Sequence, residues 1–162
     1  MKQTARNVVA YLPATGPAPV PETPWVVVGA HYDHLGHGTR GTSLAAKDEV
    51  GQIHHGADDN ASGTAAVLAV AAAIGKQPHR RNIVFALWSG EEIGLVGSNA
   101  FVSAPPFPID QIAAYLNFDM VGRMQNNRLV AEGVASSPVW PRILERANVA
   151  AGFDLNALPD PY

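Results

Sequence analysis

The sequence predicts an α/β fold in which helices pack on a largely parallel sheet. Segments rich in β-branched and aromatic residues alternate along the chain with segments of helical pattern. Two of the expected strands, residues 25–33 and 81–89, are continuous apolar runs. Such runs are typical of strands buried on both faces, so we expect helical layers on both sides of the sheet.

The first half of the chain is expected to begin with a strand over residues 6–12 (RNVVAYL). Residues 13–24 contain five prolines and predict an irregular connection. The buried strand over residues 25–33 is followed by a polar, glycine-rich segment over residues 34–57, which is long enough to be a functional loop. Residues 64–76 (TAAVLAVAAAIGK) are apolar on nearly every side, so they predict a helix enclosed by the rest of the protein.

The second half is expected to contain three strands and two helices. The strands are predicted over residues 81–89, 113–120 and 128–132. The first helix is predicted over residues 93–102, ahead of two prolines. The last helix is predicted to begin at Ser137 and to end at Gly152. Its apolar side chains lie on one face: Trp140, Ile143, Leu144, Ala147 and Ala151.

The composition excludes several classes of protein. The 162 residues are 47% apolar and 15% charged with a net charge of −3, which favours one folded domain over residues 1–162 and excludes a disordered chain. No apolar run reaches the roughly 18 residues of a bilayer span, and no basic cluster indicates a nucleic-acid partner. Residues 1–6 are not followed by the apolar segment of a signal peptide, so none is expected. Because cysteine is absent, any metal must be bound by His, Asp or Glu.

Acidic residues follow three of the predicted strands. Asp33 ends the strand over residues 25–33, Glu91 and Glu92 follow the next buried strand, and Asp119 lies at the end of the third. Asp59 precedes the first helix, where backbone amides favour an anion. Because the carboxyl ends of parallel strands meet at one edge of a sheet, these carboxylates are expected to converge. Their mutual repulsion requires a cation, so a divalent metal is expected there.

Each of these residues also has a purely structural interpretation. The segment Asp58-Asp59-Asn60 fits a helix cap. The Glu91-Glu92 pair fits the solvated start of a helix, and His31 fits a buried histidine of the core. Taken together, the residues favour a common site over these separate structural roles, because all of these residues lie at strand ends or helix starts.

Four motifs occur in order: GAHYDHLG from Gly29, GADDNASG from Gly56, SGEEIGLVGS from Ser89 and NFDMVG from Asn117. Together they resemble the co-catalytic zinc aminopeptidases of metallopeptidase family twenty-eight, which also includes glutamate carboxypeptidase. The resemblance implies a three-layer α/β/α fold of the phosphorylase/hydrolase-like zinc exopeptidase type, with a mixed, mostly parallel sheet. This chain is expected to be incomplete at both ends relative to that fold.

The resemblance also implies roles for individual residues. His31 and Asp119 would bind one zinc ion, Asp59 would bridge two ions, and Glu92 would bind the second. Glu91 would be the general base, which takes a proton from water and passes it to the leaving amine. The substrate would be a peptide with a free N-terminus, and the family suggests a secreted or periplasmic location.

The resemblance assigns Asp33 as the carboxylate that orients His31 through a hydrogen bond. It further implies a cis peptide bond between Asp59 and Asn60. The other histidines, among them His34 and His54, are expected to have loop or outer-sphere roles.

The family's second zinc ion takes a histidine from far downstream, whereas all six histidines here lie at or before His79. The second position is therefore expected to have two protein ligands, Glu92 and the shared Asp59, and to bind zinc weakly. Two alternatives follow: a metal-binding relative or fragment with impaired catalysis, and a single-zinc acyltransferase of the glutaminyl cyclase type.

Overall fold

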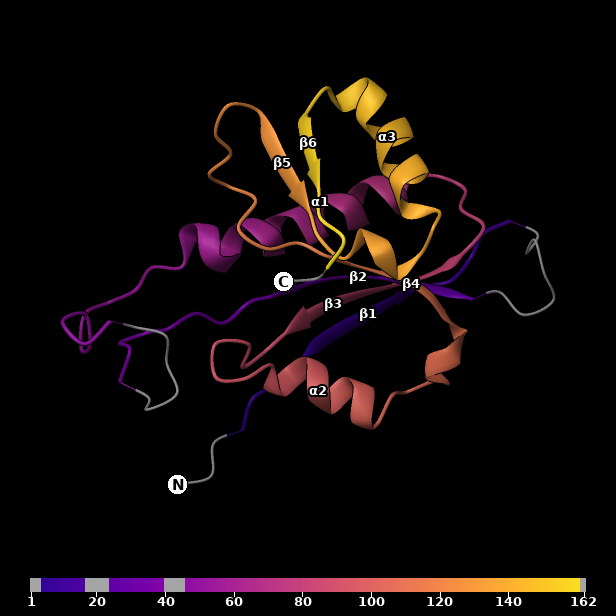
Figure 1. Ribbon diagram of the computed structural model, residues 1–162. Helices are drawn as coiled ribbons and strands as arrows, with labels where there is room; N and C mark the ends of the chain where they lie inside the picture. The colour runs from indigo at the N-terminus through magenta and orange to yellow at the C-terminus, as the bar shows by residue number, and fades with distance from the viewer. Residues whose placement is uncertain (1–3, 17–23, 40–45, 161–162) are drawn as a thin grey trace. The chain divides into compact units, whose positions relative to one another are not determined.

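The computed structural model describes residues 4–16, 24–39 and 46–160 (Figure 1). Most of the proline-rich connection and part of the glycine-rich loop that the sequence predicts lie outside the described residues, at 17–23 and 40–45. The chain forms two compact units, Met1–Gly122 and Arg123–Tyr162.

The first unit is built on a four-stranded sheet with the strand order β1-β3-β2-β4. Its strands are β1 (Val8–Leu12), β2 (Trp25–His31), β3 (Asn82–Trp88) and β4 (Ile112–Asn117). Strand β2 pairs in parallel with β3 and with β4, whereas β1 pairs antiparallel with β3 at the edge. The prediction of a mixed, mostly parallel sheet is confirmed.

The two faces of this sheet carry separate apolar cores because successive side chains of a strand point in opposite directions. On one face, Val28 and Ile83 pack with Val67 of α1 (Gly63–Ile74). On the other face, Val27 and Val84 pack with Phe101 of α2 (Val96–Ser103). Figure 1 shows α1 and α2 on opposite sides of the sheet, so the three-layer α/β/α arrangement is confirmed.

Helix α1 is not enclosed on all sides, so that prediction is wrong for its outer face. Val67 is buried against the sheet, whereas Leu68 on the outward side is 58% exposed. The outer face is otherwise formed mainly by alanines, which expose little apolar area and favour the helix through their backbone propensity.

The segment between β3 and α2 also differs from the prediction. Helix α2 begins at Val96, three residues later than expected, because residues 91–95 form a turn. The carbonyl oxygen of Glu91 accepts hydrogen bonds from the N–H groups of Gly94 and Leu95. The Glu91-Glu92 pair therefore lies on a turn at the end of β3, and Glu92 is buried rather than solvated.

The second unit contains a two-stranded parallel sheet, β5 (Arg128–Ala131) with β6 (Asp154–Ala157). Helix α3 (Trp140–Ala151) connects the two strands and ends at Gly152 in a left-handed conformation, as the sequence predicts. Strand β6 was not predicted because its four residues, DLNA, include none of the β-branched or aromatic types that favour strands.

Short helical turns complete the elements. The structure has a π-helix at Ala57–Ser62 and 3₁₀ helices at Ile109–Gln111 and Val134–Ser136. None of the helices in the described part of the chain combines the length and apolarity that a membrane span requires.

The fully buried Val84 provides a test of the sheet core. Val84→Ala is expected to lower the free energy of unfolding by about 2 kcal/mol, because it removes buried methyl groups and leaves a cavity. Urea denaturation measures this change. The control is Val8→Ala on the exposed side of edge strand β1, with an expected change within about 0.5 kcal/mol. Equal losses in the two variants would contradict the placement of the core.

Candidate metal centre

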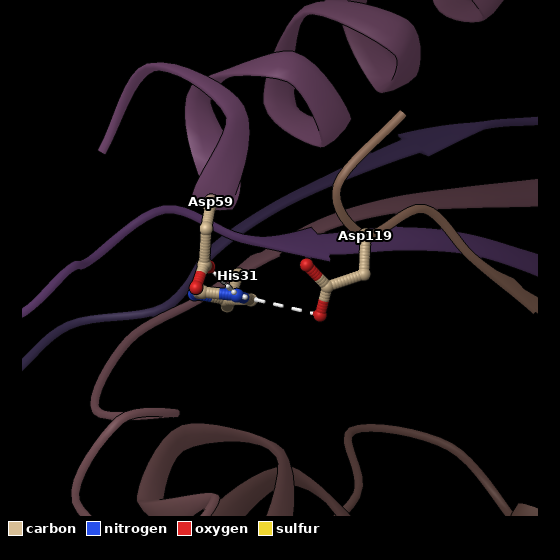
Figure 2. A group of neighbouring side chains, drawn as sticks. All are labelled: His31, Asp59 and Asp119. Atoms are coloured by element: carbon tan, nitrogen blue, oxygen red, sulfur yellow. Dashed lines mark ion pairs between the residues drawn. The ribbon is translucent and has the colours of Figure 1, made fainter. Parts of the chain in front are cut away.

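The predicted site residues lie together at one edge of the sheet. His31 is the last residue of β2, and Asp119 follows β4 by two residues. Glu91 and Glu92 lie on the turn after β3, and Asp59 lies just before α1. Figure 2 shows the side chains of His31, Asp59 and Asp119 pointing toward one another. The central position of β2 between β3 and β4 produces this convergence.

The imidazole of His31 is the centre of the group, and its side chain is 3% exposed. Its Nε2 lies 3.0 Å from Asp59 Oδ1, 3.5 Å from Asp119 Oδ2 and 3.9 Å from Glu91 Oε2. Its Nδ1 donates a hydrogen bond to the backbone carbonyl of Asp33 at 3.0 Å. One ring nitrogen is thus oriented by the backbone, and the other faces three carboxylates.

The carboxylate of Asp33 has a different partner from the one predicted. Its Oδ1 lies 3.8 Å from His31 Nδ1, farther than the carbonyl oxygen of the same residue. The same Oδ1 accepts a hydrogen bond from the N–H of Glu91 at 3.1 Å. Asp33 therefore orients His31 through its backbone and fixes the Glu91 turn through its side chain.

The segment that carries Asp59 departs from helical geometry. Asp59 has φ −103° and ψ 95°, and the Asp59–Asn60 peptide bond is cis, as the resemblance implied. Asn60 Oδ1 accepts the N–H of Gly63 at 2.9 Å. Among the residues of the predicted cap, Asn60 thus binds the start of α1, while Asp59 faces His31.

Beyond its place in the predicted cap, Asn60 has a role in the site that the sequence did not predict. Its side chain is almost completely buried. Its Nδ2 donates to the carbonyl oxygen of Phe118 at 2.9 Å, and its Oδ1 also accepts the N–H of Met120 at 3.3 Å. Asn60 therefore ties the segment of Asp59 to the residues on both sides of Asp119. No periodic pattern in the sequence marks this role.

A second group of side chains surrounds Glu92. The Glu92 carboxylate is buried, and its Oε1 accepts a hydrogen bond from His34 Nδ1 at 2.6 Å. The same Nδ1 lies 3.8 Å from Asp59 Oδ2. The two oxygens of Asp59 thus lie near different imidazoles, Oδ1 near His31 and Oδ2 near His34.

The carboxylates change the proton affinity of the site in the metal-free chain. Burial of His31 lowers its pKa, but the hydrogen bond and charge of Asp119 and the charge of Glu91 outweigh burial and raise the pKa from 6.5 to about 9. Burial raises the pKa of Glu91 above its ordinary value of 4.5, and the nearby carboxylates add to the rise while the charge of His31 opposes it. Without a metal, a proton on His31 partly compensates the negative charge.

The donor atoms fit divalent zinc. Imidazole nitrogen and carboxylate oxygen are zinc ligands in proteins. Within the described residues, two sets that share Asp59 could each hold an ion: His31, Asp59 and Asp119, and His34, Asp59 and Glu92. Asp59 Oδ1 is buried and, among the described residues, has no hydrogen-bond partner. A bound cation would satisfy this oxygen.

A three-layer α/β fold with imidazole and carboxylate donors at the strand ends defines this chain as a candidate metal-binding α/β protein. The chain belongs to peptidase family M28, whose sequence model matches residues 7–160. It is similar to a probable lipoprotein aminopeptidase, LpqL, of Mycobacterium tuberculosis, with 36% identity over 140 residues, covering 85% of this chain and 24% of the relative. An aminopeptidase of Pseudomonas aeruginosa is 36% identical over 112 residues, covering 68% of this chain and 18% of the relative.

Solved structures show the same fold. A zinc aminopeptidase from Bacillus subtilis, BSAP, superposes with a TM-score of 0.67 at 26% identity, over 95% of this chain and 34% of that one. A glutaminyl cyclase of Porphyromonas gingivalis has a TM-score of 0.68 at 19% identity, over 96% of this chain and 57% of that one. The chain spans about a quarter or less of the length of the curated relatives named above.

The raised pKa of His31 predicts how the stability of the zinc-free chain depends on pH. The folded state keeps a proton on His31 up to a pH of about 9, whereas the unfolded state loses it near 6.5. The contribution of this proton to stability is therefore complete below pH 6.5 and is lost as the pH rises to about 9. The slope is at most about 1.4 kcal/mol per pH unit.

Urea denaturation of the zinc-free chain at several pH values across this interval measures the effect. His31→Gln is expected to remove the slope, and His37→Gln, at an exposed histidine, is expected to keep it. The same slope in the His31→Gln chain would contradict the assignment.

Proposed function

We propose that this chain is the core of a zinc-dependent aminopeptidase that hydrolyses the N-terminal peptide bond of its substrate. The observation that carries the proposal is the position of Asp59 between two groups of donors. Its two oxygens lie near two different imidazoles, each accompanied by a further carboxylate. A carboxylate in this position can bridge two cations, as two-metal hydrolytic sites require.

Under this proposal, His31, Asp59 and Asp119 hold the first zinc ion. Asp59 and Glu92 contribute to the second position. Asn60 supports the site from outside by fixing the backbone around Asp59 and Asp119 through its hydrogen bonds. Bound zinc would act as a Lewis acid on the scissile carbonyl and would lower the pKa of the attacking water.

Glu91 is the residue that transfers a proton from the attacking water to the leaving group. Its backbone is held by the carboxylate of Asp33, and its own carboxylate lies at the edge of the His31 group. Burial raises its pKa toward the range in which a carboxylate can both accept and return a proton. Glu91 would take a proton from the attacking water and deliver it to the nitrogen of the leaving group.

The negative charge of the site favours substrates with a free amino terminus. Carboxylates gather at this edge of the sheet, and a protonated or metal-directed α-amino group would be attracted to them. The names of the relatives from Mycobacterium tuberculosis and Pseudomonas aeruginosa as aminopeptidases support this choice of substrate. The lipoprotein relative supports a location in the cell envelope or outside the cell.

The roles of the two adjacent glutamates can be separated by mutation. Glu91→Gln is expected to lower the rate of release of a chromogenic group from an aminoacyl substrate by about 10²–10⁴-fold, because the proton acceptor is lost. Its zinc content should not change. Glu92→Gln is expected to lower the zinc content instead. The control is Glu132→Gln at an exposed position, with an unchanged rate and zinc content.

Near-full activity of Glu91→Gln would overturn its assignment as the base. The original chain, offered a peptide with an N-terminal glutamine, tests the alternative acyltransferase. Cyclisation of that glutamine without hydrolysis of aminoacyl substrates would replace the aminopeptidase proposal. Zinc binding without either reaction would indicate a metal-binding relative without catalysis.

A further inference from the structure

We propose that Asn7 is a positioning residue, which holds the turn after β3 so that the carboxylate of Glu91 lies beside His31. The proposal rests on the function proposed above, in which Glu91 is the general base. The side chain of Asn7 acts through the backbone on either side of Glu91 rather than on the substrate.

The direction of β1 brings Asn7 close to the end of β3. Asn7 directly precedes β1, and β1 runs antiparallel to β3 with Val8 opposite Leu87. The start of β1 therefore lies beside the last residues of β3, at the edge of the sheet where the candidate metal centre lies. A residue that is distant from Glu91 in the sequence thus reaches the turn that carries Glu91.

The amide of Asn7 binds both ends of the segment that contains this turn. Its Oδ1 accepts a hydrogen bond from the N–H of Ser89 at 3.2 Å, and its Nδ2 donates one to the carbonyl oxygen of Gly97 at 2.8 Å. Ser89 is the first residue after β3, and Gly97 is the second residue of α2. One side chain therefore sets the separation between the end of the strand and the start of the helix, with Glu91 between them.

The contact between Asn7 and these two residues is close. Ser89 and Gly97 are buried, so their backbone groups need partners within the protein. A Cβ at Gly97 would collide with Oδ1 of Asn7 and with the backbone nitrogen and oxygen of Ser89, so only glycine allows this approach. Removal of the Asn7 amide would therefore loosen both ends of the turn and leave a gap beside a buried N–H.

The turn contains a conformation that depends on its surroundings. Leu95 has φ 57° and ψ 31°, a left-handed conformation that costs free energy in a residue with a Cβ. The carbonyl oxygen of Glu91 accepts the N–H groups of Gly94 and Leu95. The N–H of Glu91 binds the carboxylate of Asp33. These bonds fix the middle of the turn, whereas Asn7 fixes its two ends.

The backbone next to Asn7 is held by a residue from the end of β2. The carbonyl oxygen of Arg6 accepts a hydrogen bond from the hydroxyl of Tyr32 at 2.6 Å. Tyr32 directly follows His31 in the sequence. The segment of Arg6 and Asn7 thus contacts both the end of β2 and the turn after β3, and it links the positions of His31 and Glu91.

Hydrogen–deuterium exchange of the zinc-free chain, followed by mass spectrometry, tests the contact without catalysis. Asn7→Ala is expected to raise the exchange rate of the amides in residues 89–97 by roughly tenfold, because the hydrogen bonds at both ends of the turn are lost. The exchange rate of β3 should stay unchanged. A similar rise in both segments would overturn the proposal, because Asn7 would then only stabilise the fold.

A more conservative variant separates the two hydrogen bonds. Asn7→Asp keeps an oxygen that accepts the N–H of Ser89 but loses the N–H group that binds Gly97. It should protect Ser89 as in the original chain, while the start of α2 exchanges faster. It also replaces Asn7→Ala if the alanine chain does not fold, as judged by circular dichroism.

Asn148→Ala is the matched control. Asn148 is another partly buried asparagine whose amide donates one hydrogen bond to the backbone and accepts one from it, both with Phe153 at 2.8 Å. It lies in the second compact unit. Its loss should leave the exchange of residues 89–97 and the rate of catalysis unchanged.

Kinetics of the zinc-loaded chain test the effect on catalysis. With a chromogenic aminoacyl substrate, Asn7→Ala is expected to lower kcat by about 10–100-fold and to leave KM within about twofold, because a displaced base slows the reaction without changing how the substrate binds. Excess zinc should not restore kcat. Full recovery with excess zinc would overturn the proposal, because the defect would then lie in metal binding by Glu92, which lies on the same turn.

A double variant tests whether Asn7 acts through Glu91. If it does, the chain that carries both Asn7→Ala and Glu91→Gln loses no more kcat than Glu91→Gln alone. If the two losses multiply, Asn7 acts independently of Glu91 and the inference fails.

The same measurements separate this inference from the proposed function. If the original chain with zinc releases no product from aminoacyl substrates, the proposed function fails and this inference fails with it. If the original chain is active and Asn7→Ala keeps its kcat, the inference fails and the proposed function stands.

Discussion

The structure depends on one electrostatic constraint, which is the excess of carboxylates around a buried imidazole. His31 is buried at the end of β2, and its Nε2 lies within 4 Å of three carboxylates. Like charges so close together resist ionisation unless a cation lies among them. A proton on His31 meets part of this need, which is the cause of its raised pKa. A divalent ion at the same place would meet it more completely, since it adds charge and would bond to Asp59 Oδ1, which is near His31 but has no hydrogen bond among the described residues.

The fold brings these groups together through strand order rather than sequence proximity. Because β2 lies between β3 and β4 and runs parallel to both, the residues after all three strands reach the same edge. Asn60 then joins the segment before α1 to the residues beside Asp119. The carboxylate of Asp33 fixes the turn after β3. The backbone segments that carry Asp59, Glu91 and Asp119 are thus held by hydrogen bonds from neighbouring side chains.

The sequence predicted the strands and their acidic ends more completely than it predicted the contacts inside the site. The strands before His31 and Asp119 could be recognised from the sequence, because burial on both faces of a sheet leaves a continuous run of apolar residues. The roles of Asn60 and His34 are not visible in this way, since each has a hydrogen-bond partner 58 positions away in the sequence. The enclosure of α1 was predicted wrongly because apolar composition does not tell which faces of a helix are covered.

Anomalous diffraction at the zinc edge, from crystals of the zinc-loaded chain, tests the central claim most directly. The account predicts an anomalous peak at bonding distance, about 2.0–2.2 Å, from His31 Nε2 and from oxygens of Asp59 and Asp119. In that state His31 would hold the ion through Nε2 and would keep its Nδ1 hydrogen bond to the carbonyl of Asp33. Zinc bound elsewhere on the chain, with His31 still in direct contact with the carboxylates, would contradict the account.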